Sequence, residues 1–146
     1  MISNLPIVAK TNVFAAGRCH CLKEGTKTAV LSTGTIGNNV IEAINKSHNS
    51  ETIAHYDFPS IKPLDNNTLT TILSSFGRII TIEDGTVNGG FGSAVLEFAT
   101  SHNFKNTIEV LGIPDTFIEH GTVNQLQQLC KIDVKSLINL FSNDTK

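Results

Sequence analysis

Two adjacent carboxylates, Glu83 and Asp84, are the side chains of this sequence best placed to do chemistry. They follow residues 78–82, RIITI, whose β-branched side chains predict a buried strand. The carboxyl ends of such strands are where open α/β sheets place their sites. The pair could act as general acid and base. We favour a second interpretation, in which the carboxylates accept hydrogen bonds from backbone amides of the stretch that follows, or cap the next helix.

The stretch after the carboxylates is rich in glycine and leads into an apolar helical face. Glycines let a backbone turn tightly or approach a neighbour closely, and we expect Gly90 to need a positive φ or a close contact. Gly-Gly-x-Gly is a weak phosphate-binding signature, because it lacks a lysine and a complete fingerprint spacing. We therefore favour a packed strand-to-helix loop that contains Gly85, Gly89, Gly90 and Gly92 and precedes Ala94, Val95, Phe98 and Ala99.

Other polar residues each allow a functional and a structural interpretation. Lys62 could bind an anion, although an exposed lysine is usually only solvated. His120 could be a general base or a hydrogen-bonded structural histidine. Cys19-His20-Cys21 could suggest a metal, but we interpret it as a strand, because the next cysteine, Cys130, is far along the chain. The sequence identifies no partner for His48, His55 or His102.

Composition narrows the function classes. The 146 residues, 40% of them hydrophobic, predict one globular domain, in which residues 1–16 form a connecting arm and residues 17–146 the domain proper. A net charge of −2 gives no reason to expect nucleic acid as a partner. The first residues lack the pattern of a signal peptide, and no run approaches the ~20 apolar residues that span a bilayer. We expect a soluble, cytoplasmic protein with no membrane partner, whose three cysteines are reduced thiols.

Strands and helices are expected to alternate along the chain. Short apolar runs predict five strands, at 19–22, 28–32, 52–56, 78–82 and 107–111. The second of the intervening helices should begin at Asp65 as N-cap and end at Gly77 in the left-handed conformation. This alternation predicts a three-layer α/β/α sandwich with a mainly parallel five-stranded sheet.

Loops at the carboxyl ends of the strands form the predicted crevice. We expect Phe58, Val87, Phe91 and Phe117 to be exposed there, with Lys62 as the only cation, which favours a protein contact surface over a small-molecule site. The candidate interface and crevice residues are Phe58, Lys62, Asp65, Glu83, Asp84, Gly89, Gly90, Phe91, Gly92, Asp115, Phe117 and His120.

Three strings in series resemble a known family. They are IKPLD at 61–65, TIED with GGFGSAVLE at 81–97, and GIPD with FI and HG at 112–121. In order and spacing they are similar to the C-terminal domain of 1-deoxy-D-xylulose-5-phosphate synthases, a transketolase C-terminal domain-like module, over about residues 17 to 141. Pro59-Ser60 departs from the family, which usually has an arginine and an aromatic residue there.

The resemblance implies a part of a homodimeric thiamine-diphosphate enzyme that joins pyruvate and glyceraldehyde 3-phosphate, with loss of carbon dioxide, in isoprenoid precursor synthesis. It also implies that the cofactor and its Mg²⁺ are held by N-terminal and middle domains outside this chain. We therefore assign no catalytic, cofactor-binding or metal residue here and expect the isolated chain to be inactive. The alternative is a free-standing partner- or nucleotide-binding module of the transketolase or 2-oxo acid dehydrogenase β-subunit type.

Overall fold

The computed structural model describes residues 18–86, 90–113 and 122–143. These ranges contain five strands and five α-helices, which alternate from the second strand to the fourth helix. One short 3-10 helix, η3 (Ser50–Thr52), lies between the first helix and the third strand. Each predicted strand is confirmed, with ends that differ by no more than four residues. In chain order the elements are β1 (His20–Lys23), β2 (Thr28–Thr33), α1 (Gly37–Lys46), β3 (Ile53–Asp57), α2 (Asn66–Ser75), β4 (Arg78–Thr86), α3 (Phe91–Ser101), β5 (Thr107–Ile113), α4 (Val123–Cys130) and α5 (Val134–Ser142).

The strands form one sheet in the order β1-β3-β2-β4-β5. β3, β2, β4 and β5 are parallel to one another, and only β1, at one edge, runs antiparallel to its neighbour β3. The predicted mainly parallel sheet is therefore confirmed. From β2 the chain adds β3 on one side of β2 and then returns to add β4 on the other side. The order of the strands therefore reverses between β2 and β4, which makes this the switch point of the sheet.

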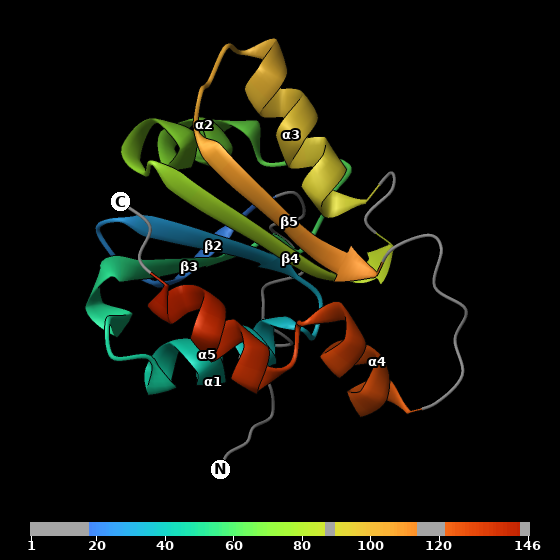
Figure 1. Ribbon diagram of the computed structural model, residues 1–146. Helices are drawn as coiled ribbons and strands as arrows, with labels where there is room; N and C mark the ends of the chain where they lie inside the picture. The colour runs from blue at the N-terminus through green and yellow to red at the C-terminus, as the bar shows by residue number, and fades with distance from the viewer. Residues whose placement is uncertain (1–17, 87–89, 114–121, 144–146) are drawn as a thin grey trace.

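Helices cover both faces of the sheet. In Figure 1, α2 and α3 lie on one side of the strands, and α1, α4 and α5 lie on the other. Successive side chains of β2 point to opposite faces, so that Ala29 and Leu31 join the core under α2 and α3 while Val30 joins the core under α1 and α5. Two apolar cores with one sheet between them confirm the three-layer α/β/α sandwich.

The ends of α2 show one correct and one wrong prediction. Asp65 is the N-cap, as predicted, and its Oδ1 accepts a hydrogen bond from the Thr68 amide at 3.1 Å. The predicted left-handed stop at Gly77 is wrong, because the helix ends one residue earlier at Phe76 in extended conformation. Asn106 supplies the missing cap from a distant loop: its Nδ2 donates to the carbonyls of Leu73, at 2.9 Å, and of Phe76.

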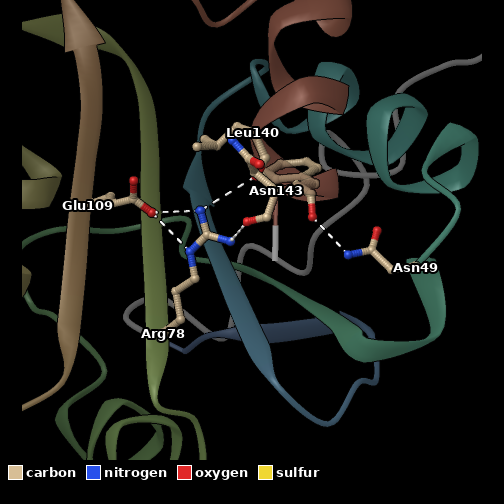
Figure 2. A network of polar contacts seen from close by, with 6 residues as sticks. Asn49, Arg78, Glu109, Leu140 and Asn143 are labelled. Carbon is tan, nitrogen blue, oxygen red and sulfur yellow. Dashed lines mark hydrogen bonds and ion pairs between the residues drawn. The ribbon is translucent and has the colours of Figure 1, made fainter. Parts of the chain in front are cut away.

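The C-terminal end of α5 is held by a network around Arg78, at the start of β4 (Figure 2). Arg78 Nε donates to Glu109 Oε1 on β5 at 3.0 Å, and Nη1 and Nη2 donate to the carbonyls of Asn143 and Leu140 at 3.1 and 3.5 Å. A cation at the last turn complements the helix dipole. The network therefore fixes α5 against the amino ends of β4 and β5. The predicted crevice lies at the opposite, carboxyl ends of the strands.

No helix within the described ranges is long and apolar enough to cross a membrane.

Candidate functional site at the carboxyl ends of the strands

Glu83 serves the fold as a helix cap. Its side chain is 4% exposed, and its two oxygens accept hydrogen bonds from the amides of Phe91 and Gly92, both at 2.9 Å. These amides belong to the first turn of α3, where backbone N–H groups lack partners within the helix and a carboxylate is favoured. The capping interpretation is confirmed for Glu83. With both oxygens occupied by amides, this carboxylate is not free to act as a base.

Asp84 lies at the point where the winding of the sheet changes. It is exposed, and its Oδ2 accepts a long hydrogen bond, 3.4 Å, from Thr35 Oγ1 in the turn after β2. That turn depends on Gly34, whose φ of +84° is the left-handed conformation that favours glycine. The pairing of β4 with β5 is irregular between Ile82 and Thr86, so the backbone on either side of Asp84 departs from a regular ladder.

A pocket of about 450 Å³ opens beside Asp84. Thr35, Asp84 and Gln127 give it polar atoms, and the remaining lining residues, apart from Thr122, are apolar. The position agrees with the rule that open α/β sheets place sites at the switch point outside the carboxyl ends of the strands. The full lining comprises Thr35, Asp84, Ile113, Thr122, Val123, Leu126, Gln127 and Ile132.

The expected exposure of Phe58 and Phe91 is wrong. Both side chains are fully buried, and their ring centroids lie 5.2 Å apart. The Phe58 amide donates to the Ser32 carbonyl at 2.8 Å, which turns the ring into the core under α2 and α3. Phe58, directly after β3, and Phe91, the first residue of α3, both complete the core instead. Neither ring can contribute to a contact surface.

Gly90 does not have the positive φ that was one of its two expected constraints, whereas Gly92 makes a close contact. Gly90 is the N-cap of α3, with φ −95° and ψ −157°, which is an ordinary extended conformation. A Cβ at Gly92 would lie 2.4 Å from Val110 Cγ1 and 2.8 Å from Thr81 Oγ1. Gly92 therefore lets α3 pack closely on β4 and β5.

Lys62 and Asp65 lie in the loop between β3 and α2 and differ in role. Lys62 is exposed, and the peptide bond that joins it to Pro63 is cis. Asp65 is tied down: Oδ2 accepts from the Cys19 amide and from Thr68 Oγ1, both at 2.8 Å. Partial burial acts to raise the pKa of Asp65, but these hydrogen bonds outweigh it and hold the pKa below the ordinary value. Asp65 is a structural link between β1 and α2.

A buried polar pair escaped the sequence analysis. Ser32 Oγ and His55 Nε2 lie 2.7 Å apart on the neighbouring strands β2 and β3, and the two residues are 0% and 1% exposed. Burial lowers the pKa of His55 to about 3, so the ring is neutral at physiological pH. Serine and histidine at this distance could form a nucleophile and a base, but no substrate reaches them. The sequence signal that could have indicated this pair was His55 itself, a histidine within the predicted strand at 52–56.

Asp57, two residues after His55 on β3 and opposite Ser32 in the β2–β3 pairing, is also buried, at 2% exposure. Burial raises the pKa of Asp57 to about 6, and the nearby His20 acts in the opposite direction. His20 stands opposite Asp57 in the β1–β3 pairing. The predicted strand at 19–22 is confirmed as β1, which agrees with the structural interpretation of Cys19-His20-Cys21.

Gly89, Asp115, Phe117 and His120, like Val87, lie outside the described residues. The structure therefore brings together Glu83, Gly90, Phe91 and Gly92 at the start of α3, with Asp84 beside them. Lys62 and Asp65 lie in the loop that precedes α2, where Asp65 caps that helix.

The sequence comparison decides the family. A sequence model described as "Transketolase, C-terminal domain" matches residues 17–137. The chain belongs to the transketolase C-terminal domain family. It is 48% identical over 123 residues to a 1-deoxy-D-xylulose-5-phosphate synthase of Bacteroides thetaiotaomicron and 45% identical over 126 residues to one of Parabacteroides distasonis. These matches cover 83% and 86% of this chain but only 19% and 20% of the relatives, so the chain spans about one fifth of their length.

Solved structures agree with this family. A split-gene transketolase, described as an "inactive beta4 tetramer", superimposes with a TM-score of 0.77 at 27% identity. The match covers 86% of this chain and 41% of that one. Transketolase from Campylobacter jejuni superimposes with a TM-score of 0.63 at 17% identity over 97% of this chain and 20% of its own, which supports the fold alone.

The donors that the structure describes in this transketolase C-terminal domain do not fit a Mg²⁺-bound diphosphate. Within the described ranges no group of three His, Cys, Asp or Glu side chains could hold a metal ion. Both oxygens of Glu83 are occupied by amides, which leaves Asp84 as the acidic side chain of the pocket. Mg²⁺ needs oxygen ligands in octahedral geometry, and a diphosphate needs cations or free amides.

Proposed function

We propose that this chain is the C-terminal domain of a thiamine-diphosphate-dependent 1-deoxy-D-xylulose-5-phosphate synthase. One observation carries the proposal: 48% identity over 123 residues to a protein of that name, in a match that covers 19% of the relative. The parent reaction would join pyruvate and glyceraldehyde 3-phosphate and release carbon dioxide. We place the parent enzyme in the cytoplasm, as a homodimer.

In this proposal the domain supports the catalytic domains and carries no catalytic residue itself. The acidic residue that stands out in the sequence, Glu83, is used to hold α3, and the Ser32–His55 pair is buried. The pocket at the switch point offers a carboxylate where a phosphate substrate would need a cation. These features suit a rigid scaffold that presents a surface to neighbouring domains.

The coding sequence upstream of Met1 tests the proposal. An in-frame or adjacent coding region for the cofactor-binding domains supports a synthase domain or subunit. A solitary gene, in a genome that encodes a complete synthase elsewhere, would favour the alternative, a free-standing partner- or nucleotide-binding module. The match to a split-gene transketolase keeps a separately encoded subunit within the first outcome.

Calorimetry on the isolated chain gives a second, biochemical test. With no group of metal-binding side chains in the described ranges, we expect no tight binding of thiamine diphosphate with Mg²⁺ and no synthase activity. Micromolar binding by this chain alone would contradict the assignment of the cofactor to other domains.

A further inference from the structure

Helix α4 differs from the other four α-helices in the way it packs. α1, α2, α3 and α5 each bury at least two residues, whereas α4 buries none. Its apolar residues Val123, Leu126 and Leu129 recur every three positions, which is the pattern of a helix that covers a core. Val123 and Leu129 are nevertheless 71% and 67% exposed, and among the described residues the only other large hydrophobic side chain in this class is Leu96.

Polar contacts hold both ends of α4, and Cys130 in its last turn packs, partly buried, against the core under α1 and α5. Thr122 and Gln125 form a capping box at its start, and Lys131 ends it in the left-handed conformation. Asn39 on α1 donates to Gln127 Oε1 at 3.2 Å and to the Ile132 carbonyl at 3.1 Å, and Ile132 itself is buried. The helix is thus fixed at both ends, while Val123 and Leu129 are left exposed by the part of the chain that the structure describes. A surface fixed in advance loses little entropy when a partner binds.

The apolar stripe continues into the pocket at the switch point. Val123 and Leu126 line that pocket together with Ile113 and Ile132, and Asp84 stands at its polar side. We call this surface the α4 face: Ile113, Val123, Leu126 and Leu129, with Asp84 at the rim and the buried Ile132 beneath it. No Lys, Arg or His is among the pocket-lining residues, so the rim charge is negative.

We propose that the α4 face docks another domain of the parent synthase, through a segment that fills the pocket with an apolar side chain and places a hydrogen-bond donor or a cation against Asp84. This inference rests on the proposed function. The matched relatives carry about four fifths of their length outside the region that this chain covers, and that part of their chain is the source we propose for the docked segment. Apolar surface of this kind marks interaction sites.

A second copy of this chain fits the same face less well. A symmetric contact uses one patch on both subunits, and it would bring two Asp84 carboxylates into a single interface. None of the pocket-lining residues is basic and could pair with them. Like charges in an interface are destabilising. The docked segment is therefore expected to come from a different surface, of complementary charge.

The test joins residues 17–146 to the upstream part of the Bacteroides thetaiotaomicron synthase, in place of the matching region, and compares hydrogen exchange of α4 in the chimera and in the 146-residue chain. We expect exchange over residues 123–130 to slow by about tenfold or more in the chimera. Val123→Glu with Leu129→Glu should abolish this protection. Leu96→Glu is the matched control, because Leu96 is an exposed leucine, at 40%, on α3 across the sheet.

The melting temperature of the 146-residue chain separates docking from folding. Both α4 substitutions replace exposed side chains, so the isolated chain should melt as the wild type does. Protection of α4 in the chimera supports the inference whether or not the chimera is active. Equal exchange in the chimera and the isolated chain, or protection that survives the double substitution, overturns it. The activity of the chimera tests the proposed function separately.

Discussion

Glu83 and Gly92 are joined by a hydrogen bond of 2.9 Å between a buried carboxylate and the second backbone amide of α3. The other carboxylate oxygen of Glu83 accepts a hydrogen bond from the Phe91 amide at the same distance. The residue that looks most like a catalytic acid in the sequence is thus the group that joins the end of β4 to the start of α3. This geometry explains why an acid stands directly before a glycine-rich helix start.

Glu83→Gln should destabilise the domain by roughly 1–3 kcal/mol, because the new amide group would face a backbone N–H and leave it without an acceptor. Urea denaturation measures the change. Glu97→Gln is the matched control, since it makes the same substitution at an exposed position of α3. Equal, small effects at both positions would contradict the capping role of Glu83.

Gly92→Ala should cost roughly 1–3 kcal/mol, because the added Cβ would overlap Val110 and Thr81 and force α3 away from the sheet. Gly77→Ala is the control. Nothing lies within 4 Å of a Cβ at Gly77, so this change should be neutral or slightly stabilising. Melting temperatures compare the two, and a harmless Gly92→Ala would show that the close approach of α3 is not required.

His55 should make the domain less stable as the pH falls. The pKa of His55 is about 3 in the folded protein and about 6.5 when unfolded, so below pH 6.5 the unfolded chain takes up a proton that the folded protein does not. The stability present above pH 6.5 is lost progressively towards pH 3. The loss that arises from His55 is about 2 kcal/mol at pH 5.

His55→Gln measures this contribution, because glutamine can still place a polar group opposite Ser32 without titrating. The difference in urea midpoint between wild type and variant should shrink when the pH is lowered from 7.5 to 5. Asp57, whose raised pKa of about 6 stabilises the folded state as the pH falls, is present in both proteins and cancels in the comparison. A difference that is independent of pH would contradict the neutral, buried state of His55.

Arg78→Lys should loosen the end of α5. Arg78 is 12% exposed and reaches Glu109 and two carbonyls at once, and a lysine cannot reproduce that fork. We expect a loss of about 1–2 kcal/mol and faster hydrogen exchange in the last turn of α5. Glu109→Gln, at a half-exposed partner, should have the smaller effect. A larger loss of stability in Glu109→Gln than in Arg78→Lys would contradict the role given to the Arg78 fork.

Periodicity was enough to predict the sheet, the three layers and the N-cap at Asp65, because strands and helices of this length bury one regular face each. Whether a side chain near a loop points into the core or into solvent was harder to predict. Phe58 directly follows β3 and Phe91 is the first residue of α3, and only the full set of packed neighbours turns them inward. The Ser32–His55 pair needed the strand order, since the residues are 23 positions apart and meet only because β2 and β3 are neighbours.

The end of α2 was mispredicted for a related reason. Gly77 offers a local stop, but the cap comes from Asn106, about 30 residues further along the chain. Long-range contacts of this kind leave no periodic trace in the sequence. The α4 face was missed because its residues read as an ordinary buried stripe, and only their exposure in the folded domain distinguishes them.

The rate at which the chimera of the Bacteroides thetaiotaomicron synthase and residues 17–146 forms 1-deoxy-D-xylulose 5-phosphate tests the central claim most directly. A second chimera that carries the C-terminal domain of Campylobacter jejuni transketolase, which shares the fold at 17% identity, is the control. We predict activity within about tenfold of the intact synthase for the first chimera and a far larger loss for the second. A folded first chimera that is as inactive as the control would contradict the assignment of this chain to a synthase.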